Sequence, residues 1–203
     1  MARLPIYLYG SDVLRRVAKP VEQLDNETIK LIYDMFETMS NANGVGLAAT
    51  QVGVMKRVIV IDVTPAEDDE AEGGEEHGGE PVQPAAPVDE GPKKIVLINP
   101  VVIESVGTLT MEEGCLSIPD VRADVDRVGQ VKIRFRDANF EEQELEADGL
   151  LGRVILHEID HLNGVLFIDH IGSTKRGLMR GKLRKIKKGE VETSYPVVTQ
   201  VEV

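Results

Sequence analysis

The chain has 203 residues, 42% of them hydrophobic and 29% charged, which suits one packed domain or at most a domain with an appendage. Its longest apolar runs are four or five residues, whereas a membrane-spanning helix needs about 20, and the first residues lack the apolar stretch of a secretory signal. The net charge of −12 argues against general nucleic-acid binding and the single cysteine argues for a reducing compartment, so we expect a cytoplasmic protein.

Hydrophobic spacing predicts the first helix. Asp25 or Asn26 can cap it, and it should run to about Ser40, because the sequence Asn-Ala-Asn-Gly at residues 41–44 stops it. The side chains expected on its apolar face are Ile29, Ile32, Met35, Phe36 and Met39. Two runs rich in β-branched residues, 57–63 and 94–103, are then predicted to be strands.

An acidic segment separates these two strands. Residues 64–92 carry ten acidic residues and no basic ones, and residues 65–91 are rich in glycine and proline but poor in large apolar side chains. Such a segment buries too little surface to offset the entropy of ordering, so a disordered loop is predicted over residues 65–91.

The second half of the chain is predicted to hold two more strands, 131–136 and 142–146, joined by a turn at 137–139. Asp148 can cap a helix over 149–162 that Asn-Gly ends, and Ser173 can cap a last helix to about Lys187. The order helix, strands, helix, helix predicts an α+β domain with a mostly antiparallel sheet.

The predicted helix 149–162 contains the sequence His-Glu-Ile-Asp-His. His157 and His161 are four residues apart, so they lie on one helix face and can offer two imidazole nitrogens to one metal ion. Glu158 projects to the side of such an ion, where a general base would meet water. Two surface histidines beside a salt-bridging glutamate are the plainer interpretation, and a metal site needs a third ligand.

The third ligand has several candidates. Phe167 stands where a metzincin carries its third histidine, which excludes that family. Asp169 and His170 could serve only if the chain after the helix folds back sharply. Cys115 lies in a polar, glycine-containing stretch rather than an apolar strand, and its thiolate with two imidazoles would leave one tetrahedral position open. A small buried hydrophobic residue is the alternative for Cys115.

Three segments resemble those of bacterial peptide deformylases, in the same order. They read Gly-Val-Gly-Leu-Ala-Ala-Thr-Gln at 44–51, Glu-Gly-Cys-Leu-Ser at 113–117 and His-Glu-Ile-Asp-His-Leu-Asn-Gly at 157–164. The resemblance covers roughly residues 4–171, and the acidic segment 65–91 departs from it as an insertion. It implies a mostly antiparallel sheet wrapped around a central metal-binding helix, with helices near both ends. It also implies a hydrolase that removes the formyl group from the N-terminal formylmethionine of new proteins and releases formate.

The resemblance assigns a role to each motif residue. Three residues would hold one divalent metal ion: Cys115, His157 and His161. Fe²⁺ would be the metal in the cell, although one sulfur and two nitrogens also suit Zn²⁺, Ni²⁺ or Co²⁺. Glu158 would transfer the proton, while the Gln51 side-chain amide and the Leu116 backbone N–H would stabilise the oxyanion. Each such donor typically lowers the barrier by about 3 kcal/mol.

Six residues would bind the substrate: Gly44, Val45, Gly46, Gly114, Leu150 and Val154. The first four would let the formyl peptide pair like an added strand, with the glycines allowing close approach of the backbone. By helical spacing Leu150 and Val154 share a face with the two histidines, where they would contact the methionine side chain or simply belong to the core. Glu113 and Arg127 are predicted to form a supporting ion pair behind the cysteine, of the weak kind common at surfaces.

Two other functions stay open at the level of the sequence. One is an H-E-x-x-H zinc peptidase, against which the missing third histidine and Cys115 argue. The other is a non-catalytic, metal-stabilised paralogue that binds ribosomes, against which the presence of Glu158 and Gln51 argues.

The sequence also predicts a division of the chain by role. We expect a catalytic domain over residues 1–172 and a basic helix and tail over 173–203, with no membrane and no specific DNA partner. Residues 175–188 carry eight basic residues and no acidic ones, so they could dock on ribosomal phosphates, or they could form a solvated helix that completes the fold.

Overall fold

The structure, a computed structural model, describes residues 2–63 and 94–199. The acidic segment 65–91, predicted to be a disordered loop, lies outside these ranges. The described helices are α1 Asn26–Asn41, α2 Gly149–Leu162 and α3 Ser173–Lys187, with short 3-10 helices at Asp12–Arg15, Ala49–Val52 and Phe167–Asp169. The described strands are β1 Ile6–Tyr7, β2 Gly46–Ala48, β3 Val58–Asp62, β4 Lys94–Val106, β5 Leu109–Cys115, β6 Ile118–Arg127, β7 Gln130–Arg136, β8 Glu142–Asp148 and β9 Val197–Val198.

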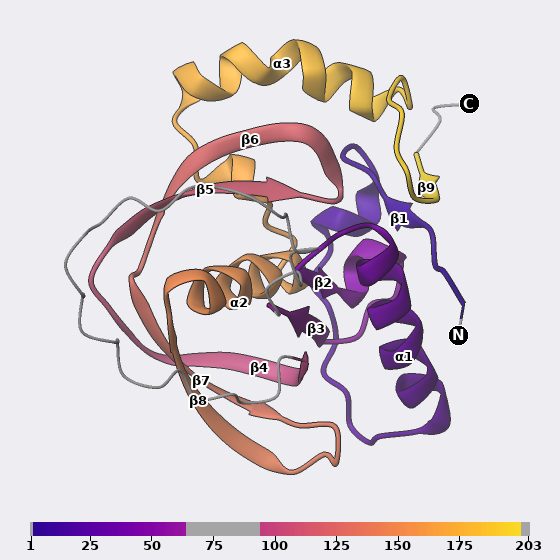
Figure 1. Cartoon of the computed structure of the whole chain (residues 1–203), viewed down its shortest axis with the longest axis vertical. Coiled ribbons are helices and arrows are strands. Elements are labelled where there is room, and N and C mark those ends of the chain that lie inside the picture. Colours follow the sequence, from indigo (N-terminus) through magenta and orange to yellow (C-terminus); the bar gives the residue numbers. More distant parts are fainter. Residues whose placement is uncertain (1, 64–93, 200–203) are drawn as a thin grey trace, which may run out of the picture.

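The strands form three small sheets around one helix. Five strands pair antiparallel in the order β2-β3-β4-β7-β8, β5 and β6 form an antiparallel hairpin, and β1 and β9 pair in parallel. Figure 1 shows α2 between the five-stranded sheet and the β5–β6 hairpin, with α1 to one side and α3 across the outside of the hairpin. The prediction of an α+β fold with mostly antiparallel sheets is confirmed.

Helix α1 begins and ends where the sequence predicts. The Asp25 carboxylate accepts hydrogen bonds from the Thr28 N–H (2.7 Å) and hydroxyl (2.6 Å), which satisfies a donor that the first turn would leave free. The predicted apolar face is wrong at one edge. Ile29 is 37% exposed while Leu31 and Thr28 are buried, so the buried face is rotated toward Thr28 and Leu31.

The hairpin β5–β6 and the small strands at the chain ends were not predicted. The sequence of β6 contains a proline and several charged residues. Its buried apolar side chains nevertheless lie on one face: Ile118, Val121 and Val125. They pack in a core cluster with Leu166, Phe167 and Ile168 from the segment after α2. The polar stretch that contains Cys115 is thus part of a hairpin, and Cys115 is the last residue of β5.

Helix α2 is buried on both sides, which explains its position at the centre of the molecule. One face packs on β3, β4 and β7 through Ile155, Ile159 and Leu162, and the other carries the histidines toward the hairpin. Gly164 ends the helical segment with a φ of 73°, a backbone conformation that favours glycine. A side-chain carbon at this position would also lie too close to the Arg15 carbonyl, which is a second reason for glycine.

Helix α3 and the segment after it belong to the packed fold. Leu183 and Ile186 are buried in the same cluster as β6, although most of the helix surface is exposed and basic. Ser173 was expected to cap α3, but Gly172 is the N-cap and no side chain caps the helix. Beyond it, β9 joins β1 through hydrogen bonds from Ile6 N to Pro196 O and from Leu8 N to Val198 O, both 2.9 Å. In the described ranges, no helix has the length and apolar character needed to cross a membrane.

The packing of α3 predicts that shortening two side chains of equal size on this helix changes the free energy of unfolding by very different amounts. Ile186→Ala should lower the free energy of unfolding by about 2–5 kcal/mol, because Ile186 is 1% exposed. The control Leu178→Ala removes a side chain that is 86% exposed and should change it by less than about 0.5 kcal/mol. Urea unfolding measures both; equal, small effects would show that α3 is detachable from the core.

Candidate metal centre and active site

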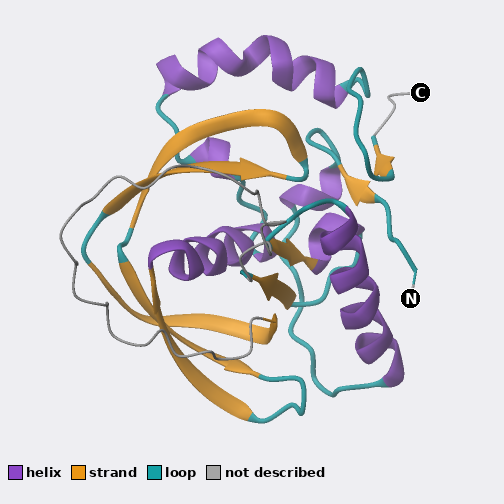
Figure 2. Cartoon of the chain, viewed as in Figure 1, coloured by secondary structure: helices purple, strands orange, loops and turns teal. Residues whose placement is uncertain are grey.

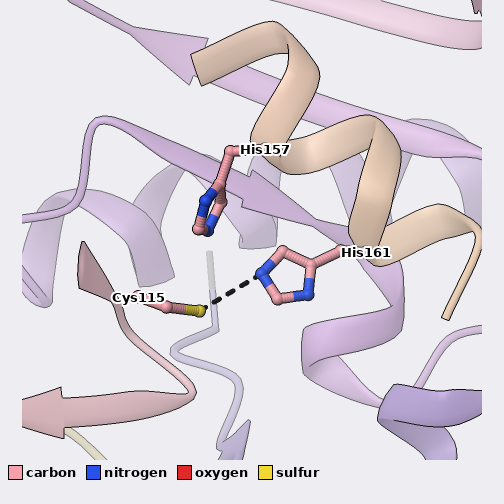
Figure 3. Close-up of side chains that lie close together, drawn as sticks. All are labelled: Cys115, His157 and His161. Atoms are coloured by element: carbon pink, nitrogen blue, oxygen red, sulfur yellow. Dashed lines mark hydrogen bonds between the residues drawn. The ribbon is translucent and has the colours of Figure 1, made fainter. Parts of the chain in front are cut away.

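The structure brings together three potential metal ligands from two elements. Cys115 comes from the end of β5, and His157 and His161 come from successive turns of α2, as Figure 3 shows. Their ligand atoms all lie within 4.8 Å of one another, and Cys115 Sγ is 3.2 Å from His161 Nε2. The two imidazole rings are 5.0 Å apart and inclined by 74°, so both can point at one ion without stacking.

The chemistry of these donors fits a divalent transition metal. His157 uses Nδ1 to meet Glu113 Oε2 at 2.9 Å, which leaves Nε2 for the ion and fixes the ring in the manner of metal-binding histidines. Burial holds the pKa of His161 well below its ordinary value, so that ring is neutral and can act as a ligand. One thiolate and two imidazoles form a three-ligand set that leaves a position open for water or substrate.

Asp169 and His170, the other candidates for the third ligand, are engaged elsewhere. Asp169 pairs with Arg15, and its carboxylate also accepts the N–H of Leu166. His170 Nε2 lies 2.7 Å from Asp160 Oδ2. The chain after α2 does return to the site, where the Phe167 ring stacks on that of His157 at 6.2 Å between centroids, but the side chains of Asp169 and His170 bind these other partners.

A buried charge network stands behind the ligands. Arg127 meets Glu113 with two hydrogen bonds of 2.6 and 3.0 Å, so the ion pair predicted from the sequence is present. It is not the weak surface pair that we expected, since both side chains are buried. Arg153 Nη1 also donates to Glu113 Oε1 at 2.9 Å, and Arg127 reaches Asp160 at 2.6 Å. Burial alone would raise the pKa of Glu113, but its hydrogen bonds to His157 and Arg127 hold that pKa well below its ordinary value.

Two residues of this network, Arg153 and Asp160, were not predicted from the sequence. Arg153 lies four residues before His157 on an otherwise apolar stretch of α2, and that isolated arginine was the signal that could have identified it. Asp160 gave no comparable signal, because an acidic residue on a helix is usually solvated.

Glu158 is buried beside the ligands, and its position depends on Gly46. Its Oε2 atom has no hydrogen-bond partner among the described residues, and burial raises the pKa of Glu158 to about 7. A side-chain carbon at Gly46 would lie 2.7 Å from Glu158 Oε1 and 2.7 Å from Val154 Cγ1. Gly46 therefore makes room for the Glu158 carboxylate, a reason different from the approach of the peptide that the sequence suggested.

Gln51 is oriented by hydrogen bonds at both ends of its amide. Its Oε1 accepts the Ala48 N–H at 2.8 Å, and its Nε2 lies 3.3 Å from Ser117 Oγ and 3.6 Å from Cys115 Sγ. Gln51 is thus a buried residue with its amide donor beside the thiol, not an exposed turn residue. Leu116 lies in the turn after β5, where its carbonyl accepts the Tyr195 hydroxyl at 2.8 Å. Tyr195 had no role in the sequence analysis.

A groove of about 610 Å³ opens beside the metal centre. All six predicted substrate-binding residues line it: Gly44, Val45, Gly46, Gly114, Leu150 and Val154. Val154 is buried in its wall, whereas Leu150 is 51% exposed at its mouth. Residues 192–195, which follow α3, complete the lining on the side away from α2.

Comparisons with known proteins agree on one family. The family described as polypeptide deformylase matches residues 3–177. The chain is 48% identical over 198 residues to the peptide deformylase of Salinibacter ruber, covering 97% of this chain and 95% of that protein. It is similar to the crystal structure of a peptide deformylase from Legionella pneumophila, with 37% identity, a TM-score of 0.75 and coverage of 93% and 98%. The Ehrlichia chaffeensis peptide deformylase in complex with actinonin is similar at 34% identity, a TM-score of 0.75 and coverage of 95% and 100%.

The network behind His157 predicts the effect of removing one charge. Glu113→Gln should destabilise the fold by about 3–5 kcal/mol, because two buried arginines lose their shared anion. It should also weaken zinc binding by about 10–100-fold, because His157 loses the acceptor that orients its ring.

The neighbouring Glu112 offers a matched control. It is exposed and pairs with Arg122 at 3.6 Å, so Glu112→Gln should cost less than about 1 kcal/mol and leave zinc affinity unchanged. Urea unfolding and competition with a chelator measure the two quantities. Similar losses in both variants would contradict the importance assigned to the buried network.

Proposed function

The chain belongs to the polypeptide deformylase family, and on that premise we propose which of its residues carry out the reaction. It is a metal-dependent hydrolase that removes the N-formyl group from the N-terminus of newly synthesised proteins. The zinc peptidase, which the sequence alone left open, does not agree with this membership. Against the non-catalytic paralogue stand the names of the curated relatives and the presence of both Glu158 and Gln51. The observation that carries the assignment of the site is the cluster of one thiol and two imidazoles beside the buried Glu158 carboxylate, one oxygen of which has no hydrogen-bond partner among the described residues.

Cys115, His157 and His161 are the proposed metal ligands. Their convergence within 4.8 Å and the neutral state of His161 support this assignment. A divalent ion held there supplies Lewis-acid activation of water and of the formyl oxygen. We propose Fe²⁺ as the working metal from the resemblance to bacterial deformylases, although the same donors suit Zn²⁺, Ni²⁺ and Co²⁺.

The substrate peptide is proposed to bind between two strand edges. β2 is the outer strand of the five-stranded sheet, and β5 pairs only with β6, so each offers one edge to the groove. An extended peptide can add to such an edge through backbone hydrogen bonds. The Val45 carbonyl already accepts the Asp62 N–H at 3.0 Å, so Val45 would use its N–H, and Gly114 would pair from the opposite side.

The methionine side chain is proposed to lie against α2. Val154 forms the inner wall and Leu150 the rim of the groove, one and two turns before His157. An unbranched, polarizable thioether adapts well to such a surface. Docked there, the methionine would present its formyl group to the metal ligands.

Two donors are proposed for the negative charge that develops on the formyl oxygen. The Gln51 amide is held beside Cys115 by its bond to Ala48, and the Leu116 N–H lies in the adjacent turn. Because both are fixed before the substrate arrives, they need no reorganisation during the reaction.

Glu158 is proposed to move the proton. Its carboxylate takes a proton from water as the water oxygen bonds to the formyl carbon, and it then passes that proton to the leaving nitrogen. The carbon–nitrogen bond breaks, giving formate and a free N-terminal amine. A carboxyl group with a pKa of about 7 is suited to both steps, because it can accept and return a proton near neutral pH.

Glu158→Gln tests this assignment directly. We expect formate release from formyl-Met-Ala-Ser to fall at least 100-fold, while metal content stays stoichiometric, because proton transfer is lost and the ligands are intact. The protein should be purified without oxygen, and iron, nickel, cobalt and zinc should be measured by elemental analysis. Cys115→Ala is the comparison variant and should lose the metal. If Glu158→Gln loses metal as well, Glu158 is a ligand and its proposed role is wrong.

We also propose which part of the chain catalyses the reaction, which part binds the ribosome, and where in the cell the enzyme acts. Residues 1–172 carry the proposed metal ligands and the other proposed catalytic and substrate-binding residues, while the basic residues of 175–188 dock the enzyme on the ribosome in the cytoplasm. Residues 192–195 complete the lining of the groove. Support comes from α3, whose basic side chains are exposed while its two buried residues hold it to the hairpin. Phosphates of ribosomal RNA would attract such a surface.

Neutralising two exposed arginines tests docking without disturbing the fold. Arg180→Gln with Arg184→Gln should weaken ribosome pelleting and reduce the slope of log affinity against log salt by about 1–2, since each lost phosphate contact removes about one. Formate release from short peptides should not change. Arg16→Gln with Lys19→Gln, both exposed near the other end of the chain, is the control. Equal losses of pelleting in the two double variants would contradict a docking role for α3.

A further inference from the structure

Two segments that are far apart in the sequence, one near each terminus, contact the turn that carries Leu116. After α3 the chain reverses, and β9 pairs with β1 (Figure 1). Between α3 and β9, residues 192–195 line the groove. The Tyr195 hydroxyl donates to the Leu116 carbonyl at 2.8 Å. The Tyr9 N–H, just after β1, donates to the Ser117 carbonyl at 2.8 Å. Two successive carbonyls of the turn thus accept hydrogen bonds from residues that lie near opposite termini.

The turn itself is short, and the Ser117 side chain is held from outside the hairpin by the Gln51 amide at 3.3 Å. It joins β5 to β6 with only Leu116 and Ser117 between Cys115 and Ile118, and the register of the hairpin shifts between Gly114 and Cys115. An irregular turn of this kind leaves the dihedral angles of Leu116 to be fixed by neighbours outside the hairpin. The Leu116 side chain packs on the α1 core cluster, and Tyr195 packs on the same cluster.

Tyr195 is placed firmly enough to act as such a neighbour. Its ring is partly buried, and the Thr193 hydroxyl donates to its backbone carbonyl at 2.8 Å. The adjacent Pro196 carbonyl accepts the Ile6 N–H, which begins the β1–β9 pairing. Burial raises the pKa of Tyr195 to about 12, with the nearby Cys115 and Asp120 adding to the effect, so its hydroxyl keeps the proton that it donates.

We infer that Tyr195 is a positioning residue of the active site: by holding the Leu116 carbonyl it fixes the direction of the Leu116 N–H toward the formyl oxygen. This inference rests on the proposed function, in which that N–H stabilises developing charge. The segment after α3 then acts in catalysis as well as in folding, although it touches none of the proposed metal ligands directly. A donor that is misdirected costs rate and not ground-state affinity, since the charge it meets exists only in the transition state.

Tyr195→Phe tests the inference by removing one oxygen atom. We expect kcat on formyl-Met-Ala-Ser to fall about three- to ten-fold, the effect of one net hydrogen bond, while KM stays within two-fold. Metal content and the thermal unfolding midpoint should match the wild type. Amide hydrogen exchange at Leu116 and Ser117 should become faster, because the backbone of the turn has lost one of the hydrogen bonds that hold it from outside the hairpin.

Tyr33→Phe is the matched control, since Tyr33 is an exposed residue of α1 on the outer face of the molecule. It should leave kcat and the exchange rates of the turn unchanged. A Tyr195→Phe enzyme with unaltered kcat would overturn the inference. A fall in kcat matched by loss of metal or of thermal stability would also overturn it, because a structural contact explains that result. If the wild-type protein releases no formate, the proposed function fails instead.

Discussion

A single buried carboxylate, that of Glu113, joins the strand that carries the thiol to the helix that carries both histidines. It meets Arg127 of β6, and Arg153 and His157 of α2, within 3.0 Å. Transferring these charges out of water is costly, and the cost is offset only while every partner is in place. The network therefore favours the one arrangement of hairpin and helix in which the three ligand atoms converge.

The burial of α2 on both sides has a second consequence for the site. A helix packed against a sheet on one face and a hairpin on the other cannot rotate or slide without opening a core cluster. The ligands, the buried carboxylate of Glu158 and the wall residue Val154 therefore keep fixed distances from one another. In the proposed function, the half-exposed side chain of Leu150 at the mouth of the groove is the part left to adapt to different peptides.

Local patterns in the sequence were sufficient for some features and not for others. The spacing of His157 and His161 predicted a shared helix face, and the ends of α2 were predicted from residues at its two boundaries, because these are properties of neighbouring residues. Asp148 occupies the N-cap position as expected, but its side chain makes no capping hydrogen bond. The hairpin β5–β6 escaped prediction since its buried residues are separated by charges and a proline. Arg153 and Tyr195 lie 40 and 79 residues from their partners Glu113 and Leu116, and no local pattern reports a contact over such distances.

The parallel pairing of β1 with β9 sets the order in which the protein can be completed during its own synthesis. Ile6 and Val197 are 191 residues apart in the sequence, yet they are partners in one sheet. The central helix and its histidines can begin to pack while the chain is still growing, since folding proceeds from the amino-terminal side. The wall that Tyr195 forms must wait until the segment after α3 has been synthesised. A chain stalled before that point would contain the proposed metal ligands and lack the finished groove.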